Sequence, residues 1–195
     1  MYYKGEKLDA PHVQDTDFHG YGASIKERLS AIIPADEDLR VLDVGTGMAS
    51  NVRFLLEHMS KRSEVWTLDP SEEMLSRAKE KVGAEDRRRV RFVKGTADAL
   101  EFEDKSFDLV VSVMVAHHME KVDESIAEMA RVLKRGGRVI IVDYSPEAHV
   151  LEFHSRHAEK DFVKPGAITR AMKKAHLKRR VENYDMWYLI EGSRE

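Results

Sequence analysis

Short apolar runs alternate with longer segments from residue 40 onward, and in the longer segments apolar residues recur every three or four positions. The short runs are rich in β-branched residues, which is typical of parallel strands covered on both faces. The longer segments have the period of the helices that connect such strands. The expected strands are Val41–Val44, Val65–Leu68, Val90–Val93, Leu109–Val113 and Val139–Val142. The pattern predicts an α/β fold with a doubly wound, mostly parallel sheet.

Helices are expected in the segments before and between these strands. They span Ser24–Ile33, Asn51–Ser60, Ser71–Val82 and Asp123–Leu133. Asp123 is expected to cap the last helix, and Gly136 with Gly137 to end it before the fifth strand.

The C-terminal part continues with a mostly helical stretch to about Ala175. The segment LKRRVENYDMWYLIEG then predicts two strands that turn around Asn183–Asp185. These two strands complete a seven-stranded sheet that ends in an antiparallel edge hairpin.

Composition narrows the class of protein. The 195 residues show no repeat or linker, so residues 1–195 are expected to form one domain. The chain has neither an apolar stretch of ~20 residues nor a signal-peptide pattern, so we expect a soluble cytoplasmic protein. The lack of cysteine excludes disulfides and thiol nucleophiles. One glutamine and two asparagines beside 32 basic and 35 acidic residues suggest a thermophilic source.

The segment VLDVGTGMAS, residues 41–50, carries the strongest chemical signal. A buried strand runs here into a turn with Gly45 and Gly47 that opens a helix, where a ligand can approach backbone N–H groups. Asp69 ends the next strand 69 − 45 = 24 residues after Gly45, where a carboxylate can accept hydrogen bonds from both ribose hydroxyls. Together these features predict a nucleoside-containing cofactor.

The loop spacing argues against a dinucleotide. Ser50 occupies the third glycine position of G-x-G-x-x-G, which disfavours a nicotinamide dehydrogenase. Asp43 lies directly before the turn, where its charge suits an ammonium better than a pyrophosphate. A ligand with an amino-acid end, a sulfonium and an adenosine satisfies both Asp43 and Asp69, which points to S-adenosylmethionine.

The chain from about residue 40 to residue 145 resembles the class I S-adenosylmethionine-dependent methyltransferases, particularly the small-molecule group related to quinone-biosynthesis methyltransferases. The family's acidic-x-Gly-x-Gly signature matches Asp43, Gly45 and Gly47, and Ala49 stands where the family often has a third glycine. Three further motifs match in order, at LDPSEEML, FVKGTADALEFEDKSFDLVVSVMVAHHM and LKRGGRVIIVDYSP. The resemblance implies a Rossmann-like methyltransferase fold.

The resemblance also implies which further residues bind the cofactor. The positions are Asp69 at the ribose, Pro70 and Met74 near the adenine, Thr96, Ala97 and Asp98 at the adenine amino group, and Ser112–Met114 at the methionine end. Thr96 departs from the family, which usually has Asp or Asn there. Either the Asp98 side chain or the Ala97 backbone is therefore expected to make that hydrogen bond.

His117 and His118 follow the fourth predicted strand. His117 lies where plant small-molecule O-methyltransferases carry a base, and a base is needed when the acceptor holds a proton. His117 is therefore the candidate catalytic residue; the alternative is a histidine pair that caps the strand and packs on the next helix. No metal site is predicted, because His149, His154 and His157 lack the spacing of a metal motif.

The segments outside the core motifs offer fewer clues. Residues 1–23 are expected to be an N-terminal arm or lid, with Tyr21 contacting the cofactor carboxylate; a disordered arm is the alternative. Residues 146–175 are expected to form a short helical segment on the substrate side. Several aromatic residues suit either the core or an apolar substrate pocket, namely Phe153, Phe162, Trp187 and Tyr188.

The leading hypothesis is a methyltransferase that acts on a small-molecule acceptor. The basic clusters Arg87–Arg91 and Lys173–Arg180 fit either surface charge or a face that contacts RNA. A protein or RNA methyltransferase with an open site is therefore one alternative. A non-catalytic protein that binds S-adenosylmethionine is the other.

Overall fold

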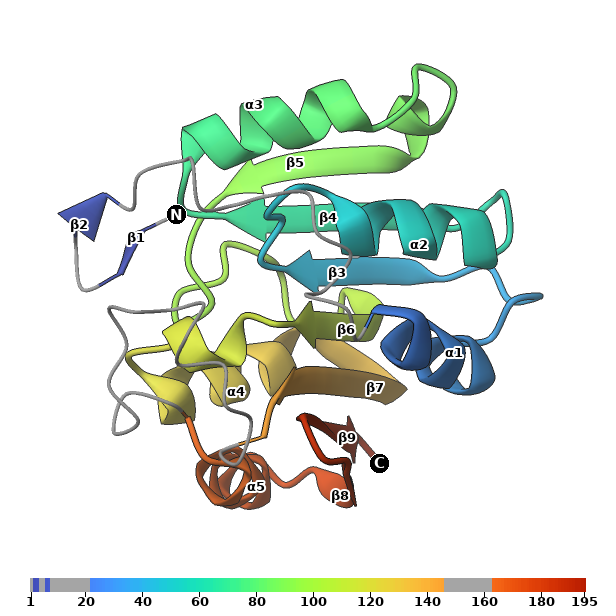
Figure 1. Cartoon of the computed structure of the whole chain (residues 1–195). Helices are drawn as coiled ribbons and strands as arrows, with labels where there is room; N and C mark the ends of the chain where they lie inside the picture. The colour runs from blue at the N-terminus through green and yellow to red at the C-terminus, as the bar shows by residue number, and fades with distance from the viewer. Residues whose placement is uncertain (1, 4–5, 8–21, 146–162) are drawn as a thin grey trace. The chain divides into compact units, whose positions relative to one another are not determined.

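A computed structural model describes residues 2–3, 6–7, 22–145 and 163–195 (Figure 1). The chain divides into two compact units, Met1–Thr96 and Ala97–Glu195. Seven strands belong to one sheet, to which the first unit contributes β5-β4-β3 in that order and the second unit β6-β7-β9-β8. The predicted seven-stranded α/β fold is confirmed.

From residue 40 onward the N-terminal unit alternates strands and helices, as the hydrophobic pattern predicts; the short strands β1 and β2 were not predicted. Its elements are β1 (Tyr2–Tyr3), β2 (Glu6–Lys7), α1 (Gly22–Ile32), β3 (Arg40–Val44), α2 (Ser50–His58), β4 (Glu64–Asp69), α3 (Glu72–Lys81), the 3₁₀ helix η3 (Asp86–Arg89) and β5 (Val90–Lys94). In Figure 1, β3, β4 and β5 run side by side, with α2 packed on β4 and α3 on β4 and β5.

Parallel pairing brings the carboxyl ends of these strands together. Val41 of β3 is in register with Val65 of β4, which in turn faces Val90 of β5. These three valines are almost completely buried, as expected for strands covered on both faces. The polar residues that follow β3 and β4 therefore lie at the same edge of this part of the sheet.

Helix α3 shows why its predicted start was accurate. Ser71 is the residue before the helix, and its hydroxyl accepts a hydrogen bond from the backbone N–H of Met74 at 3.3 Å. The apolar side chains of Met74, Leu75 and Ala78 lie on one buried face. A capping serine and a helical period together fix both the position and the orientation of this helix.

The C-terminal unit ends in the predicted hairpin. Its elements are β6 (Phe107–Val113), the 3₁₀ helix η4 (Ala116–His118), α4 (Val122–Val132), β7 (Leu133–Tyr144), α5 (Pro165–Lys174), β8 (Lys178–Asn183) and β9 (Trp187–Ser193). Strand β6 pairs in parallel with β7, whereas β9 is antiparallel to both β7 and β8. Strand β8 is the edge.

The prediction that Gly136 and Gly137 end helix α4 is wrong. Both glycines lie inside β7, which begins at Leu133, directly after the helix. A side chain at Gly137 would lie 2.9 Å from the Lys134 carbonyl oxygen, so close backbone approach explains this glycine. The helix end is instead satisfied by the Arg194 guanidinium, whose Nη1 donates to the carbonyl oxygen of Ala130 at 2.8 Å.

Asp123 is not the cap of α4, because Lys121 occupies that position and makes no side-chain capping hydrogen bond. Asp123 lies in the first turn, where its charge favours the helix dipole, and it pairs with Lys174 of α5. Within the described ranges, no helix is long and apolar enough to cross a membrane.

Candidate functional site

The loop between β3 and α2 is bound to the end of β4. The N–H groups of Gly45 and Thr46 both donate to the Leu68 carbonyl oxygen, at 2.8 and 3.0 Å. Gly45 and Gly47 have φ values of 93° and 47°, which L side chains rarely adopt. A Cβ added at Gly47 would meet no atom of the described residues within 4 Å, so the space beside this glycine is open with respect to them.

Ala49 ends the loop in the same unusual conformation. Its φ of 63° is left-handed, although its side chain is completely buried at the start of α2. Left-handed backbone costs an L residue roughly 1–2 kcal/mol, which gives a physical reason for the glycine often found here in the family that the sequence resembles.

Asp69, at the end of β4, faces this loop. Its Oδ2 accepts the N–H of Gly47 at 3.2 Å, and its Oδ1 accepts the N–H of Ser71 at 2.9 Å. Burial raises the pKa of this carboxyl, and the two backbone donors act in the opposite direction. An ionised carboxylate can accept about four hydrogen bonds, so Asp69 retains capacity for ribose hydroxyls.

Asp43 lies in β3, just before the loop, and is almost fully buried. Its Oδ1 accepts from the Asn51 side-chain amide, and its Oδ2 accepts from the Thr67 hydroxyl at 2.7 Å. Thr67 also contacts the hydroxyl of Thr46 at 2.7 Å, so the network joins β3, α2, β4 and the loop. Burial raises the pKa of Asp43 to about 6. The contact of Asp43 with an ammonium stays a prediction.

Asn51 is a residue that sequence analysis missed. It is 6% exposed and donates to Asp43 from the first turn of α2. The available signal was its type, because it is one of two asparagines in the chain and directly follows the glycine loop. Its partner could not be deduced without knowing that β3 and α2 bring the two side chains together.

The predicted adenine residues of the N-terminal unit differ in exposure. Pro70 follows β4 and is exposed, whereas Met74 is 2% exposed on the inner face of α3. Thr96 is exposed at the end of the unit. Their contacts with an adenine ring stay predictions.

In the C-terminal unit, Ala97 and Asp98 form a turn. The Asp98 carboxylate pairs with Nζ of Lys121 at 2.9 Å, and this hydrogen bond raises the pKa of Lys121. Ser112 of β6 is fully buried, and its hydroxyl has no hydrogen-bond partner in the described parts of the chain. The geometry thus gives Asp98 a partner that sequence analysis did not foresee.

His117 is hydrogen-bonded to Asp143, the penultimate residue of β7. Nδ1 of His117 lies 2.7 Å from Oδ1 of Asp143, and the backbone N–H of His117 donates to Oδ2 at 2.9 Å. The N–H of Tyr144 also donates to Oδ1, at 2.7 Å. The two side chains of the pair are 5% and 1% exposed. The structure therefore places a histidine and a carboxylate in a buried, directed contact.

The chain reaches this geometry through an abrupt change of direction after β6. Met114 has a φ of 57°, rare for a bulky residue, and its N–H donates to the Val142 carbonyl oxygen at 2.8 Å. The 3₁₀ helix η4 follows and carries His117 and His118, whose rings are 4.0 Å apart. Backbone strain of this kind is concentrated at functional sites.

The structure brings together the predicted donor residues at the ends of two strands of the N-terminal unit. Asp43, Gly45, Gly47 and Asp69 come together at the ends of β3 and β4. Tyr21 and most of the proposed lid lie outside the described residues, as do His149, Phe153, His154, His157 and Phe162. Among the described residues, no group of three or more histidines and carboxylates could hold a metal. The remaining aromatic candidates, Trp187 and Tyr188, are buried core residues of β9.

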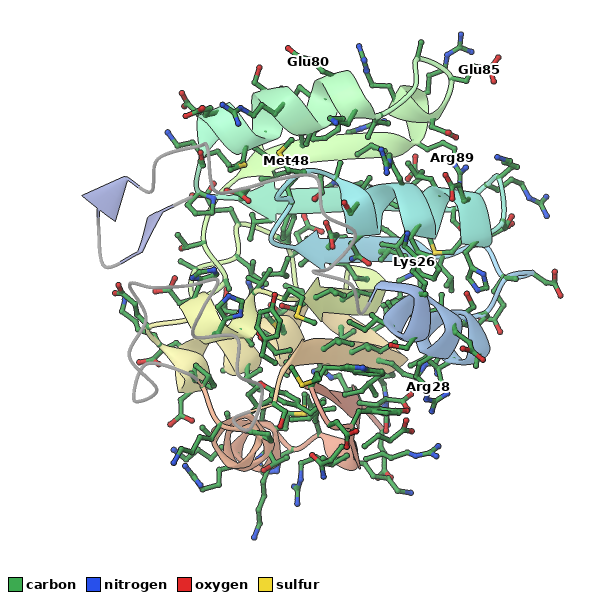
Figure 2. All side chains as sticks on the ribbon, in the orientation of Figure 1. Lys26, Arg28, Met48, Glu80, Glu85 and Arg89 are labelled. Carbon is green, nitrogen blue, oxygen red and sulfur yellow. The ribbon has the colours of Figure 1, made fainter. Side chains whose placement is uncertain are left out.

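Part of the basic cluster Arg87–Arg91 is structural. Arg89 donates to the carbonyl oxygens of Ser60 and Ser63 at 2.8 and 3.1 Å, and its side chain is 13% exposed. Figure 2 labels Arg89 toward the C-terminal end of α2, with Met48 of the glycine loop at the other end. Arg89 therefore adds little to the positive charge at the surface, and the cluster exposes fewer basic side chains than the sequence suggests.

A glycine loop hydrogen-bonded to an acidic strand end, on a sheet with this strand order, defines a Rossmann-like S-adenosylmethionine-dependent methyltransferase. Comparison with known proteins agrees, because the family model described as "Methyltransferase domain" matches residues 42–141. The chain belongs to this methyltransferase family.

Similar proteins extend the comparison. An uncharacterised methyltransferase of Bacillus subtilis, YcgJ, is 35% identical over 62% of this chain and 47% of its own length. A demethylmenaquinone methyltransferase of Bacillus cereus is 37% identical over 54% of this chain and 45% of its own. The chain thus spans about half the length of these curated relatives. A solved methyltransferase structure from Aquifex aeolicus shares the fold with a TM-score of 0.79 at 19% identity, covering 95% and 98% of the two chains.

Proposed function

We propose that this protein transfers the methyl group of S-adenosylmethionine to a small-molecule acceptor. The observation that carries the proposal is the contact between Gly47, with open space beside it, and the Asp69 carboxylate. The small-molecule class is supported by relatives such as the demethylmenaquinone methyltransferase of Bacillus cereus.

The donor fits the groups present in the N-terminal unit. Asp69 would hold the ribose through its remaining acceptor sites, and Gly45 and Gly47 would admit the methionine end. The charge of Asp43, which accepts a hydrogen bond from Asn51, would favour the donor's ammonium over a phosphate. The other proposed donor contacts are Tyr21, Pro70, Met74, Thr96, Ala97, Asp98 and Ser112.

The chemistry requires little more than binding and orientation. The sulfonium supplies an activated methyl group, which an acceptor attacks in line as the carbon–sulfur bond breaks. The protein's contribution is to fix the donor, exclude water and, where the acceptor carries a proton, to remove it.

Binding and turnover test the proposal separately. Calorimetric titration should show S-adenosylmethionine binding and no binding of NAD; the reverse result would overturn the assignment. Incubation with methyl-labelled donor and cell extract should then place the label in the metabolite fraction. Label confined to protein or RNA would refute the small-molecule acceptor. The protein would still be a methyltransferase.

An RNA acceptor is the second candidate. It is favoured by the edge strand β8, which exposes Lys178, Arg179 and Arg180. Mixing with bulk tRNA should in that case give binding that weakens steeply with salt. Binding of tRNA that does not change with salt concentration would exclude an RNA acceptor.

A further inference from the structure

Strand β8 has a strand partner on one side of its backbone only. It pairs with β9 through Lys178–Asn183, and within the described ranges no strand pairs with its other side. Figure 1 shows β8 beside β9 in the C-terminal hairpin. An edge strand presents N–H and C=O groups that can hydrogen-bond to a further strand. Which strand fits there depends on the side chains of β8.

The side chains of β8 combine three cations with an exposed apolar residue. Lys178, Arg179 and Arg180 are exposed. Val181 is 41% exposed and, with Tyr184, makes up the exposed large hydrophobic residues of the described ranges. Charged residues on an edge strand usually prevent association, because like charges meet when two such edges pair. A partner strand must therefore offer an apolar residue to Val181 and negative charge to the arginines.

A second copy of β8 meets this requirement in one antiparallel register. Directly opposite residues of an antiparallel pair have the same hydrogen-bonding direction, and this direction alternates along each strand. Two identical strands must therefore pair about a residue and not about a point between two residues. The register centred on Val181 places this valine opposite its counterpart, Arg180 opposite Glu182 and Arg179 opposite Asn183.

The neighbouring registers are less favourable because they bring like charges together. A pair centred on Arg180 would place two guanidiniums opposite each other, and a pair centred on Glu182 would place two carboxylates opposite each other. Like charges directly opposite are destabilising, whereas opposite charges stabilise the pair. About Val181, no two like charges of β8 are directly opposite. The strand is therefore complementary to itself, as a two-fold symmetric interface requires.

Glu182 has the capacity to bind a guanidinium of a second copy. Its carboxylate, 17% exposed, lies 3.2 Å from Nε of Arg180 in the same strand and accepts the Tyr184 hydroxyl at 2.9 Å. An ionised carboxylate has about four acceptor sites, and a guanidinium has five N–H donors. The Arg180 side chain is 69% exposed, so it can donate both to its own Glu182 and to Glu182 of a second copy.

We propose that two copies of this protein associate through their β8 strands, which pair antiparallel about Val181. The hairpins of the two copies then form a continuous sheet, with two Arg180–Glu182 ion pairs between the chains. One pair of short strands gives a small interface, so the dimer should be weak, with a Kd of about 10–100 μM. The association needs no methyl donor and is therefore independent of the proposed function.

Association is measured first on the unaltered chain. Sedimentation velocity between about 1 and 500 μM should show a mass that rises from that of one chain towards that of two. The mass of one chain over this whole range would overturn the inference. Because this measurement uses the natural protein, it does not depend on whether a variant folds.

Charge reversal tests the register. Arg180→Glu brings carboxylates together at the interface and Glu182→Arg brings guanidiniums together, so each variant alone should associate at least about tenfold more weakly. A mixture of the two variants has opposite charges at both positions and should associate as tightly as the natural chain. The control is Arg88→Glu, at an exposed arginine outside β8, which should associate like the natural chain.

Mixing distinguishes contacts between chains from contacts within one chain. If Arg180 and Glu182 served only their own strand, the mixture would stay as weak as its components, because each chain would keep its like charges. That result, or natural association of either variant alone, would overturn the inference. Circular dichroism checks that both variants are folded. The exposed Val181→Lys supplies a further variant, which should also weaken association because two cations would then meet.

RNA is the alternative occupant of β8. In that case binding of bulk tRNA should weaken in Arg180→Glu and strengthen in Glu182→Arg, since it follows the total charge of the strand. This outcome, together with a natural chain that does not associate, would assign β8 to RNA and overturn the dimer.

Discussion

The backbone N–H of Gly47 donates to Oδ2 of Asp69 across 3.2 Å, so the glycine loop after β3 and the carboxylate that ends β4 form one hydrogen-bonded unit. The second oxygen of Asp69 is held by Ser71 in the same way. The carboxylate is therefore oriented by backbone donors before any ligand arrives, and such preorganisation lowers the entropic cost of binding.

Asp69→Asn should weaken S-adenosylmethionine binding at least about tenfold, or about 1.4 kcal/mol. The substitution removes the charge and directs an amide N–H₂ group at a backbone donor, either Gly47 or Ser71. Calorimetric titration measures the effect. Asp36→Asn, at an exposed aspartate of the same unit, should leave the affinity unchanged. An unaltered Kd in Asp69→Asn would exclude the ribose contact.

Gly47→Ala separates ligand binding from folding. The added methyl group meets no atom of the described residues, and the left-handed φ of 47° should cost about 1–2 kcal/mol of stability. The methyl would occupy space that the donor needs, so its Kd should rise by at least about tenfold. Gly83→Ala is the matched control, because it also has open space but no left-handed backbone. Normal donor affinity in Gly47→Ala would show that this space is not the donor site.

Asp43 should make stability depend on pH. Its pKa is raised from 3.8 to about 6, so the folded state binds the proton more tightly than the unfolded state. Its contribution to the free energy of unfolding is therefore greatest at low pH and is lost as the pH rises through 6. Between pH 7.5 and pH 5, the natural protein should gain about 1–2 kcal/mol relative to Asp43→Asn. Denaturant unfolding at both pH values measures the difference, and a gain in the opposite direction contradicts the burial effect.

Arg89→Ala should destabilise the protein by about 2–3 kcal/mol, because charge-assisted hydrogen bonds to the carbonyl oxygens of Ser60 and Ser63 are lost. Thermal or denaturant unfolding measures the loss. The neighbouring Arg88 is exposed, and Arg88→Ala should change stability by less than about 0.5 kcal/mol. Equal effects of the two substitutions would show that Arg89 contributes no more to stability than an exposed arginine of the cluster.

The sequence predicted the bounds of an element accurately where the residues that form the pattern and the contacts that stabilise the element lie close together in the chain. The strands β3 to β6 and helix α3 were placed within two residues, since burial on both faces and the Ser71 cap act over short distances, whereas β7 begins six residues before its predicted start. The end of α4 was misjudged because the group that satisfies it, Arg194, lies far along the chain. Glycines that usually end helices instead allow close backbone contact inside β7.

The sequence by itself determined the α/β order of elements and the candidate donor residues Asp43, Gly47 and Asp69, because those signals are periodicity and spacing along one chain. The family motifs were recognised by their resemblance to known methyltransferases. Only the tertiary structure joined Asn51 to Asp43 and Asp143 to His117. Each of these contacts links different elements, and a hydrogen bond depends on distance and direction in space. That is why the position of His117 suggested a base, whereas its carboxylate partner came from the fold.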